Sequence, residues 1–357
     1  MKALITAGGH GTRLRPITYS MNKHLIPIGN KPMIFHAIEK IAEAGITEIG
    51  INVNEGDHTI EESVGDGSAW GVKVTYLEQA GGALGLAHII KNARDFLGED
   101  SFVFYLGDNI ILGSIKPFVE AFLSSGASGY LALSKVPDPQ RFGVPELGKN
   151  GEILRVVEKP ENPPSEFAVT GIYCYDASVH DAVDGIEYSE RGELEISDVH
   201  TWLIENGHTV KYEIVEGWWK DTGKPGDLLE GNALVLDALE GANQATTVEE
   251  GVELKGEVEL LEGCQVLGKS VIHGPVSIGR NAVIRDAWIG PHTTIGHSTE
   301  IEGARVERSI VMDEADIRTD KHIVDSIIGH NATISLPHSE TESGYRMIIG
   351  ENAQLEL

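Results

Sequence analysis

The hydrophobic pattern of the first two thirds of the chain alternates between two periods. Short apolar runs typical of strands cover residues 3–5, 48–53, 72–77, 102–106 and 130–134. Between them, apolar residues recur at helical spacing over 32–44, 85–96 and 115–124. Strands that alternate with helices predict an α/β fold with a mostly parallel sheet covered by helices. Ligands of such sheets bind at the carboxyl ends of the strands.

After about residue 241 the pattern changes to one aliphatic residue at every fifth or sixth position. The residues are Ile278, Ile284, Ile289, Ile295, Ile301, Val306, Val311 and Ile317. This spacing matches neither the 3.6-residue period of a helix nor the 2-residue period of a strand. It fits stacked triangular coils, in which each short face contributes one inward aliphatic side chain and small residues occupy the corners. The alternative is a β-sandwich in which the spacing is coincidental.

The change of pattern predicts two domains, residues 1–241 and residues 242–357, and a chain of 357 residues is long enough for both. A domain of stacked coils is often used for assembly, so we expect a homo-oligomer. The histidines of the second domain are expected to be solvated rather than catalytic. They include His273, His292, His297 and His330.

The overall charge narrows the classes of partner. The formal net charge is −27, so the mean field of the protein repels phosphates. Nonspecific binding to nucleic acid or to an anionic membrane is therefore not expected. Two cysteines cannot build a disulfide framework, which favours a reducing compartment. Because no apolar run resembles a signal peptide or a membrane span, we expect a soluble cytoplasmic protein.

One segment departs from this acidic composition. Residues 4–32 read LITAGGHGTRLRPITYSMNKHLIPIGNKP, and the first acid of the chain is Glu39 although the chain has 55 acidic residues. The segment carries Arg13, Arg15, Lys23 and Lys31. A local cluster of cations of this kind can attract a phosphate ligand that the rest of the chain repels.

The glycine cluster in this segment follows the first predicted strand. Backbone N–H groups there can cradle a nucleotide, and the guanidinium of Arg13 can bind phosphate oxygens in a fork. The candidate backbone donors belong to Gly8, Gly9, Gly11 and Thr12. The cluster lacks the Lys-Ser/Thr pair of a Walker A loop and the third glycine of a dinucleotide fingerprint. Without the cations, a tight turn would be a sufficient explanation of the glycines.

Several motifs together indicate a family. The segment AGGHGTRLRPIT…NKHLIPIGNKP resembles the signature of nucleotide-sugar pyrophosphorylases. The later motifs YLGDN, RFGVPEL, VVEKP, AVTGIYCYD, RGELEISDV and WWKDTG occur in the order of glucose-1-phosphate thymidylyltransferases. LGLAH at residues 84–88 and the repeats of the tail are similar to the long type of that enzyme. The resemblance implies a Rossmann-like nucleotidyltransferase domain followed by a C-terminal left-handed parallel β-helix.

The implied reaction joins dTTP to glucose 1-phosphate and releases dTDP-glucose and pyrophosphate. A phosphate monoester has a second pKa near 6, so the attacking oxygen is already mostly ionised at neutral pH and needs no general base. The sequence offers no convincing Ser/His/Asp or Cys/His set, in agreement with that chemistry. Because a dianion must approach a polyanion, we expect catalysis to consist of positioning and charge neutralisation.

Two acidic residues are candidates for holding Mg²⁺. Asp108 follows an apolar strand and Asp221 lies in an aromatic-rich motif, and both match the motifs of the family. Magnesium is usually held by one or two carboxylates, with substrate oxygens and water completing the shell. Outside such motifs an isolated loop Asp is more often a helix cap or a turn residue. Bound between the two phosphates, the ion would reduce their repulsion and align the attack.

The resemblance assigns the sugar phosphate to Lys159 and the sugar hydroxyls to Glu158. Adjacent strand residues point to opposite faces, so both can reach one ligand only if the strand bends. We expect Pro160 to keep Lys159 extended and to end the strand there. The alternative is an ordinary surface ion pair in a solvated strand.

The remaining sugar contacts are also implied by the family motifs. They are Gly143, Val169, Tyr173 and Arg191. Gly143 would allow the backbone to approach the ligand closely, whereas Arg191 has an alternative role as an ion-pair partner of Glu193 or Glu195. The resemblance makes Arg13, Lys23, Asp108 and Lys159 the catalytic set.

The base is expected to meet Gln79, Gly85 and the residue after Lys23. That residue is usually Gln in thymidylyltransferases and is His24 here, and the 79–85 loop is slightly longer than the family pattern. A glutamine amide offers a donor and an acceptor together, whereas a neutral imidazole offers them on opposite sides of its ring. The choice between dTTP and UTP therefore stays open.

Two further classes remain as alternatives. One is a non-catalytic relative that serves regulation or assembly, which we would expect to have lost some of the phosphate-site residues. The other is a bifunctional enzyme with an acyltransferase activity in the coil domain, for which no coenzyme A site is recognisable in the sequence.

Overall fold

The computed structural model describes residues 1–79, 81–82, 84–215, 219–239, 241, 246–335, 352 and 354. The chain divides into two compact units. One comprises Met1–His10 and Met33–Asp221, and the other comprises Gly11–Pro32 and Thr222–Leu357. The boundary predicted from sequence adjoins residues 242–245, which lie outside the described residues.

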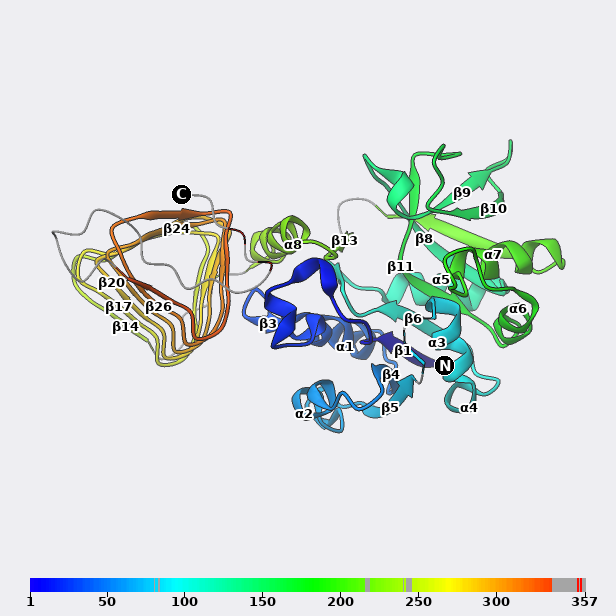
Figure 1. The fold of residues 1–357 in the computed structure, drawn as a ribbon, viewed down its shortest axis with the longest axis horizontal. Helices are drawn as coiled ribbons and strands as arrows, with labels where there is room; N and C mark the ends of the chain where they lie inside the picture. The colour runs from blue at the N-terminus through cyan, green and yellow to red at the C-terminus, as the bar shows by residue number, and fades with distance from the viewer. Residues whose placement is uncertain are drawn as a thin grey trace. The chain divides into compact units, whose positions relative to one another are not determined.

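The first unit is built on a seven-stranded sheet in the order β12-β8-β11-β6-β1-β4-β5 (Figure 1). Its strands are β1 (Lys2–Thr6), β4 (Glu48–Asn54), β5 (Lys73–Gln79), β6 (Phe102–Leu106), β8 (Gly129–Lys135), β11 (Phe167–Tyr175) and β12 (Val210–Ile214). Strands β6, β1, β4 and β5 run parallel, and β12 is parallel to β8. Only β11 runs antiparallel to its neighbours β6 and β8 within this sheet. The expected mostly parallel sheet is confirmed.

The three helical stretches predicted for the first unit are found with one difference, and the unit has further helices that the pattern did not single out. They are α1 (Met33–Glu43), α2 (Thr59–Val64), α3 (Leu86–Asn92), α4 (Arg94–Leu97), α5 (Lys116–Ser125), α6 (Val179–Gly185) and α7 (Ile196–Glu205). The single helix predicted over 85–96 is wrong, because the backbone of Ala93, with ψ of 1°, separates α3 from α4. No helix in the described ranges is long and apolar enough to cross a membrane.

One face of the sheet packs against α3, α4, α6 and α7 in a single hydrophobic core. Leu4, Phe102 and Phe104 project from the sheet into this core and are fully buried. Ile90 of α3 and Leu203 of α7 meet them from the helices. Burial of apolar surface of this extent is the main force that holds the sheet and its helices together, and so fixes the positions of the strand ends.

Two short pairs of antiparallel strands complete the first unit. The β9 strand (Gly143–Leu147) pairs antiparallel with β10 (Ile153–Glu158), and β7 (Asn109–Ile111) pairs antiparallel with β13 (Trp219–Asp221). Helix α7 is fastened along β10, because the Thr201 hydroxyl accepts from the Val156 N–H at 3.0 Å and donates to the Val156 carbonyl at 3.1 Å. The hairpin is therefore attached to the helical layer.

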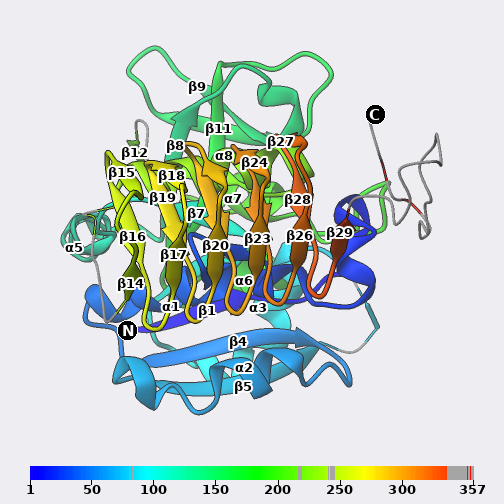
Figure 2. The ribbon, with the colours of Figure 1, turned by 90° about the vertical axis from the view of Figure 1, so that its left-hand side faces the viewer.

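The second unit contains a parallel β-helix whose three faces form a triangle in cross-section (Figure 1). One face holds β14 (Thr247–Val248), β17 (Gln265–Leu267), β20 (Val283–Arg285), β23 (Glu300–Glu302), β26 (Asp316–Arg318) and β29 (Thr333–Ser335), which lie side by side in Figure 2. The second holds β15 (Glu253–Lys255), β18 (Val271–His273), β21 (Trp288–Ile289), β24 (Arg305–Glu307) and β27 (His322–Val324). The third holds β16 (Val258–Leu260), β19 (Val276–Ile278), β22 (Thr293–Ile295), β25 (Ile310–Val311) and β28 (Ile327–Ile328).

The aliphatic spacing found in the sequence is the inner lining of these coils. Ile284 pairs with Ile301 on one face, and Ile301 pairs with Ile317 one coil further on. All eight residues of the pattern are at most 1% exposed. The triangular coil is confirmed and the β-sandwich alternative is wrong. The corners differ from the expected small residues, because His292, Arg308 and other polar residues adopt the left-handed backbone there.

Residues 11–32 and helix α8 (Pro225–Asp237) belong to the same unit as the coils. The segment contains three short 3₁₀ turns, Thr12–Leu14, Ile17–Tyr19 and Lys23–Leu25, and the hairpin of β2 (Pro27–Ile28) and β3 (Lys31–Pro32). Asn232 of α8 is fully buried and accepts from the Gly29 N–H at 2.9 Å and from the Thr294 hydroxyl at 2.7 Å. One amide thus connects the basic segment, α8 and a coil.

Candidate active site

The glycine cluster begins where β1 ends, at the carboxyl edge of the first unit's sheet. A side chain on Gly8 would lie 3.1 Å from the Asn52 Nδ2 and from the Asn54 Oδ1, so the loop passes close to the end of β4. The Gly9 N–H donates to the Asn54 Oδ1 at 2.9 Å and is therefore already engaged. Asn54 holds the first part of the candidate phosphate loop in place.

The next part of the loop is held within the second unit. Gly11 has φ of 53° and caps the turn Thr12–Leu14, which carries Arg13 on its exposed side. The Thr18 hydroxyl donates to the Gly11 carbonyl at 2.8 Å. Thr12 is exposed as well, so its backbone and the guanidinium of Arg13 are accessible to a ligand in solution.

Lys23 and His24 open the third 3₁₀ turn of this segment. The Asn22 Oδ1 accepts from the His24 N–H at 3.0 Å and contacts the His24 Nδ1 at 2.8 Å. An amide oxygen only accepts, so the Nδ1 of His24 carries the proton. The ring is 1% exposed, which fixes its orientation. A neutral His24 then has its acceptor, Nε2, on the opposite side of the ring from Asn22.

Gln79 lies at the end of β5, beside the residues that hold the glycine loop. Its Oε1 accepts from the Asn52 Nδ2 at 3.0 Å, and its Nε2 lies 3.0 Å from the His88 Nδ1. Gly85 lies next to Leu194, because the Leu194 N–H donates a hydrogen bond to the carbonyl of the neighbouring Leu84 at 2.8 Å. A Cβ on Gly85 would lie 2.3 Å from the Leu194 carbonyl oxygen, and its φ is 100°, so only glycine fits.

The two candidate metal ligands come together through the antiparallel pair of β7 and β13. Asp221 pairs with Asn109 in the antiparallel register, and Asp108 immediately precedes Asn109. The Asn109 amide donates to the Asp108 Oδ1 at 2.9 Å and accepts from the Trp219 Nε1 at 2.5 Å, so it orients the carboxylate. No group of three His, Cys, Asp or Glu side chains among the described residues is arranged to hold a metal. Two neighbouring carboxylates nevertheless fit magnesium, whose other ligands are substrate oxygens and water.

Glu158 and Lys159 lie on one side of the chain because β10 ends between them. Lys159 has φ of 41°, in the left-handed region, and its Nζ lies 2.8 Å from the Glu158 Oε1. The expectation that Pro160 keeps Lys159 extended is therefore wrong, although the strand does end at this point. The left-handed backbone supplies the bend that both side chains need in order to reach one ligand. Tertiary contacts prevail here over the usual preference of the residue before proline.

Arg191 is surrounded by carboxylates rather than paired with one. Its Nη1 lies 3.6 Å from the Glu158 Oε1 and 3.3 Å from the Glu195 Oε1, and its Nη2 lies 3.0 Å from the Glu193 Oε2. Ser197 holds the other oxygen of Glu158, because its hydroxyl donates to the Glu158 Oε2 at 2.7 Å. Both glutamates considered as structural partners are thus in contact with Arg191, and Glu158 is as well.

Tyr173 lies near both the candidate sugar-binding residues and the candidate metal ligands. Its side chain is 3% exposed on β11, two strands from β1. Burial, and then the negative charges of Glu158, Asp108 and Asp221, raise the pKa of its hydroxyl well above the usual value. The hydroxyl therefore stays protonated and can donate a hydrogen bond. Gly143 and Val169 lie on β9 and β11 of the same unit.

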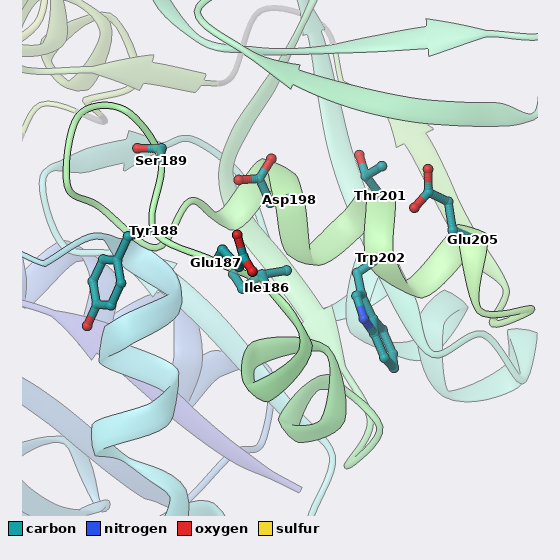
Figure 3. A pocket seen from close by; sticks show the side chains of 8 residues that line it. All are labelled: Ile186, Glu187, Tyr188, Ser189, Asp198, Thr201, Trp202 and Glu205. Carbon is teal, nitrogen blue, oxygen red and sulfur yellow. The ribbon is translucent and has the colours of Figure 1, made fainter.

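A shallow hollow of about 330 Å³ is lined by residues of α7 and of the loop that precedes it (Figure 3). Figure 3 shows Asp198, Thr201, Trp202 and Glu205 on α7, and Ile186, Glu187, Tyr188 and Ser189 on that loop. Burial and the charge of Glu158 raise the pKa of Asp198. The hollow contains none of the candidate site residues.

Four residues of the site were not singled out from the sequence. They are Asn52, Asn54, Asn109 and Ser197. Asn52 and Asn54 alternate at the end of a strand whose apolar pattern was recognised, and polar residues at that edge are a usable signal. Ser197 gives no signal, because a serine in the first turn of a helix is common for reasons of capping.

Comparisons with known proteins show the family to which the chain belongs. Residues 2–238 match the family described as nucleotidyl transferase, and residues 266–356 match the GMPPB C-terminal domain. The chain is 42% identical over its full length to all of the low-salt glycan biosynthesis nucleotidyltransferase Agl11 of Haloferax volcanii. It is 40% identical over its full length to 99% of a glucose-1-phosphate thymidylyltransferase of Streptomyces griseus.

A crystal structure gives the same result at the level of the fold. The protein is from Bacillus anthracis, is assigned as a glucose-1-phosphate thymidylyltransferase and is in complex with sucrose. It matches 68% of this chain and 98% of its own with a TM-score of 0.63 and 40% identity. The chain is therefore an enzyme of the nucleotidyl transferase family, with the long architecture in which a C-terminal β-helix follows the nucleotidyltransferase domain.

Proposed function

We propose that the protein transfers a thymidylyl group from dTTP to glucose 1-phosphate and releases pyrophosphate. The observation that supports the proposal most directly is the arrangement around Tyr173. Strand β11 lies beside both β9, which pairs with the strand that carries Glu158, and β13, which carries Asp221. The charges of Glu158, Asp108 and Asp221 also raise the pKa of the buried Tyr173 hydroxyl on β11, which supports placing the candidate metal residues and sugar residues in one site. Relatives that are 40% identical over the full chain are named for this reaction.

The triphosphate is assigned to the basic segment. Gly8, Gly11 and Thr12 would contribute backbone N–H groups, and Arg13 and Lys23 would contribute charge. Arg13 is exposed on a 3₁₀ turn, where its planar guanidinium can bind two phosphate oxygens at once. Cations at these positions oppose the repulsion of a chain with net charge −27 and stabilise the charge that develops on the departing pyrophosphate.

The sugar phosphate is assigned to Lys159 and the sugar to Glu158. Ser197 and Arg191 hold the carboxylate of Glu158 from two sides, so it can accept hydrogen bonds from sugar hydroxyls without searching for its orientation. Lys159 would exchange its ion pair with Glu158 for the phosphate dianion. The monoester is already ionised, and no residue has to remove a proton from it.

Asp108 and Asp221 would hold a divalent cation, for which we propose Mg²⁺. Their oxygen donors suit a hard cation, and Asn109 already orients Asp108. A divalent cation held there would supply positive charge that offsets the negative charge of the phosphates. Arg141, whose Nη2 lies 3.9 Å from the Asp221 Oδ2, adds positive charge beside this carboxylate.

The choice of triphosphate depends on residue 24, because His24 stands where thymidylyltransferases usually have Gln. Its Nδ1 is turned to Asn22, so a neutral ring offers an acceptor and no donor at Nε2. A uridylyltransferase is the nearest alternative. The test is pyrophosphate release with dTTP, UTP, dCTP, ATP and GTP, each against several sugar 1-phosphates with Mg²⁺. A preference for dTTP supports the proposal, and a tenfold or greater preference for UTP would replace it.

The same panel tests the two other classes. A folded protein that turns over none of the substrates would be a non-catalytic relative. We expect turnover, because Gly11, Arg13, Lys23, Asp108 and Lys159 are all present. Transfer of an acetyl group from acetyl coenzyme A to a sugar phosphate would indicate a second activity, and we expect none.

A further inference from the structure

Three polar side chains form a row at the carboxyl ends of β4 and β5, entirely within the first unit. Asn52 is fully buried, Gln79 is 6% exposed, and His88 is the third residue of helix α3. The Asn52 Nδ2 donates to the Gln79 Oε1 at 3.0 Å, and the Gln79 Nε2 lies 3.0 Å from the His88 Nδ1. The row ends against Gly8, whose added Cβ would lie 3.1 Å from the Asn52 Nδ2.

In each hydrogen bond of this row, the donor and the acceptor can be assigned. Because the Gln79 oxygen faces Asn52, the Gln79 nitrogen faces His88, and an amide nitrogen can only donate. The His88 Nδ1 must therefore accept, which places the ring proton on Nε2. Burial, and to a smaller extent Lys91, lower the pKa of His88, so the neutral ring that this bond requires is favoured.

The row has one alternative arrangement. The Asn52 Oδ1 is buried and has no hydrogen-bond partner within the described part of the chain, so nothing else holds the Asn52 amide in its orientation. If Asn52 turned over, two oxygens would face one another unless Gln79 turned over as well. Gln79 would then present its oxygen to His88, which would need a proton on Nδ1. The amide of Gln79 is thus set jointly by Asn52 and by the tautomer of His88.

The orientation of this amide has a chemical consequence for pyrimidines. Thymine and uracil place an acceptor at position 4 beside the N3–H donor, whereas cytosine places a donor at position 4 beside the N3 acceptor. Gln79 retains one N–H and one carbonyl lone pair beyond the bonds of the row. An amide that matches one edge is mismatched to the other unless it turns over.

We propose that Asn52 and His88 are positioning residues that, in the arrangement the structure shows, jointly hold Gln79 in the orientation matching thymine or uracil and thereby disfavour cytosine nucleotides. The inference rests on the proposed function, in which Gln79 meets the base. Neither residue needs to touch the nucleotide. Each acts through the direction of the hydrogen bond that it makes with Gln79.

The first test removes the acceptor on α3. In His88→Leu the Gln79 amide can turn over, so the ratio of kcat/KM for dTTP to kcat/KM for dCTP falls by about tenfold or more. His88→Asp returns an oxygen that only accepts near the position of Nδ1 and restores most of the ratio. The KM for sugar phosphate stays unchanged in both variants, since the row does not contact Glu158 or Lys159.

The matched control lies on the same helix. The Asn92 Nδ2 donates to the Glu78 carbonyl at 3.0 Å, which is also a bond from α3 to β5 but one that does not reach Gln79. Asn92→Ala should leave the ratio at the wild-type value. A ratio that falls equally in Asn92→Ala and His88→Leu would show that the effect comes from loosening α3, and would overturn the proposal.

A second variant reverses the row instead of breaking it. In Asn52→Asp the carboxylate can only accept, so Gln79 must turn its nitrogen toward residue 52, and preference shifts toward dCTP. Calorimetric binding of dTTP and dCTP in the absence of sugar phosphate gives the same comparison without turnover. If the enzyme turned over no sugar phosphate, the proposed function would fail while the ratio of the two dissociation constants still tested the row. An unchanged ratio in each folded variant, shown by its thermal melting, overturns the inference.

Discussion

Gly143→Ala tests how closely the hairpin and helix α7 must pack to position Glu158. A Cβ on Gly143 would lie 2.6 Å from the Ser197 Oγ and 3.5 Å from the Glu158 Oε2. The φ of Gly143 is not in the left-handed region, so the backbone itself accepts alanine. The new methyl group must therefore displace the hydroxyl of Ser197, which donates to Glu158 at 2.7 Å.

The magnitude follows from two costs. Overpacking a filled site costs about 1–3 kcal/mol of folding free energy. Losing a hydrogen bond to a charged group costs about 1.5–3 kcal/mol, which is roughly a tenfold to hundredfold loss of kcat/KM if Glu158 binds the sugar. Ser197→Ala removes the obstructing oxygen as well as the hydrogen bond. The double variant should consequently be no less stable than Ser197→Ala alone.

The assay is a double-mutant cycle on the free energy of unfolding in urea, together with kcat/KM for glucose 1-phosphate at saturating triphosphate. We expect Gly143→Ala and Ser197→Ala to be non-additive by about 1–3 kcal/mol. Gly226→Ala is the control, because a Cβ there meets no atom within 4 Å. Additivity within about 0.5 kcal/mol would show that Gly143 and Ser197 do not compete for the same space, and would refute the reasoning.

Three further changes probe the site and its support. Asp221→Ala should nearly abolish turnover and its dependence on Mg²⁺ while the melting temperature changes little; unchanged activity would remove Asp221 from the metal site. Arg13→Ala should lower kcat by about a hundredfold. A change confined to the KM for sugar phosphate would show that Arg13 belongs to the sugar subsite rather than to the triphosphate subsite. Burial lowers the pKa of His200 to about 3, so below pH 6.5 the unfolded chain binds a proton that the fold excludes. As the pH is lowered from 6.5 toward 3, the free energy of unfolding of the wild type should fall by about 1.4 kcal/mol per pH unit more than that of His200→Gln. Parallel pH profiles of the two proteins in urea titrations would contradict this.

The local pattern of the chain was sufficient to predict five strands of the first unit's sheet, three helical stretches and the class of each unit. The strands of the parallel sheet and the eight inward aliphatic residues of the coils are confirmed, because period and burial are properties of neighbouring residues. The break at Ala93 and the left-handed backbone of Lys159 escaped prediction. The break interrupts an apolar pattern of helical spacing, and the left-handed backbone opposes the extended conformation usual before proline. In both places contacts between residues distant in sequence outweigh the local conformational preference.

The chemistry of the candidate site likewise divides into a part that the sequence predicted and a part that only the tertiary structure decided. Residue types and their motifs determined that phosphates, a sugar and a divalent cation are the expected ligands, because glycine loops, cations and paired carboxylates have few other uses together. Only the tertiary structure decided that Asn109 orients Asp108, that Ser197 holds Glu158, and that Gln79 is fixed between Asn52 and His88. The direction of a hydrogen bond depends on which atoms from separate strands and helices meet, and no spacing along a single chain records that.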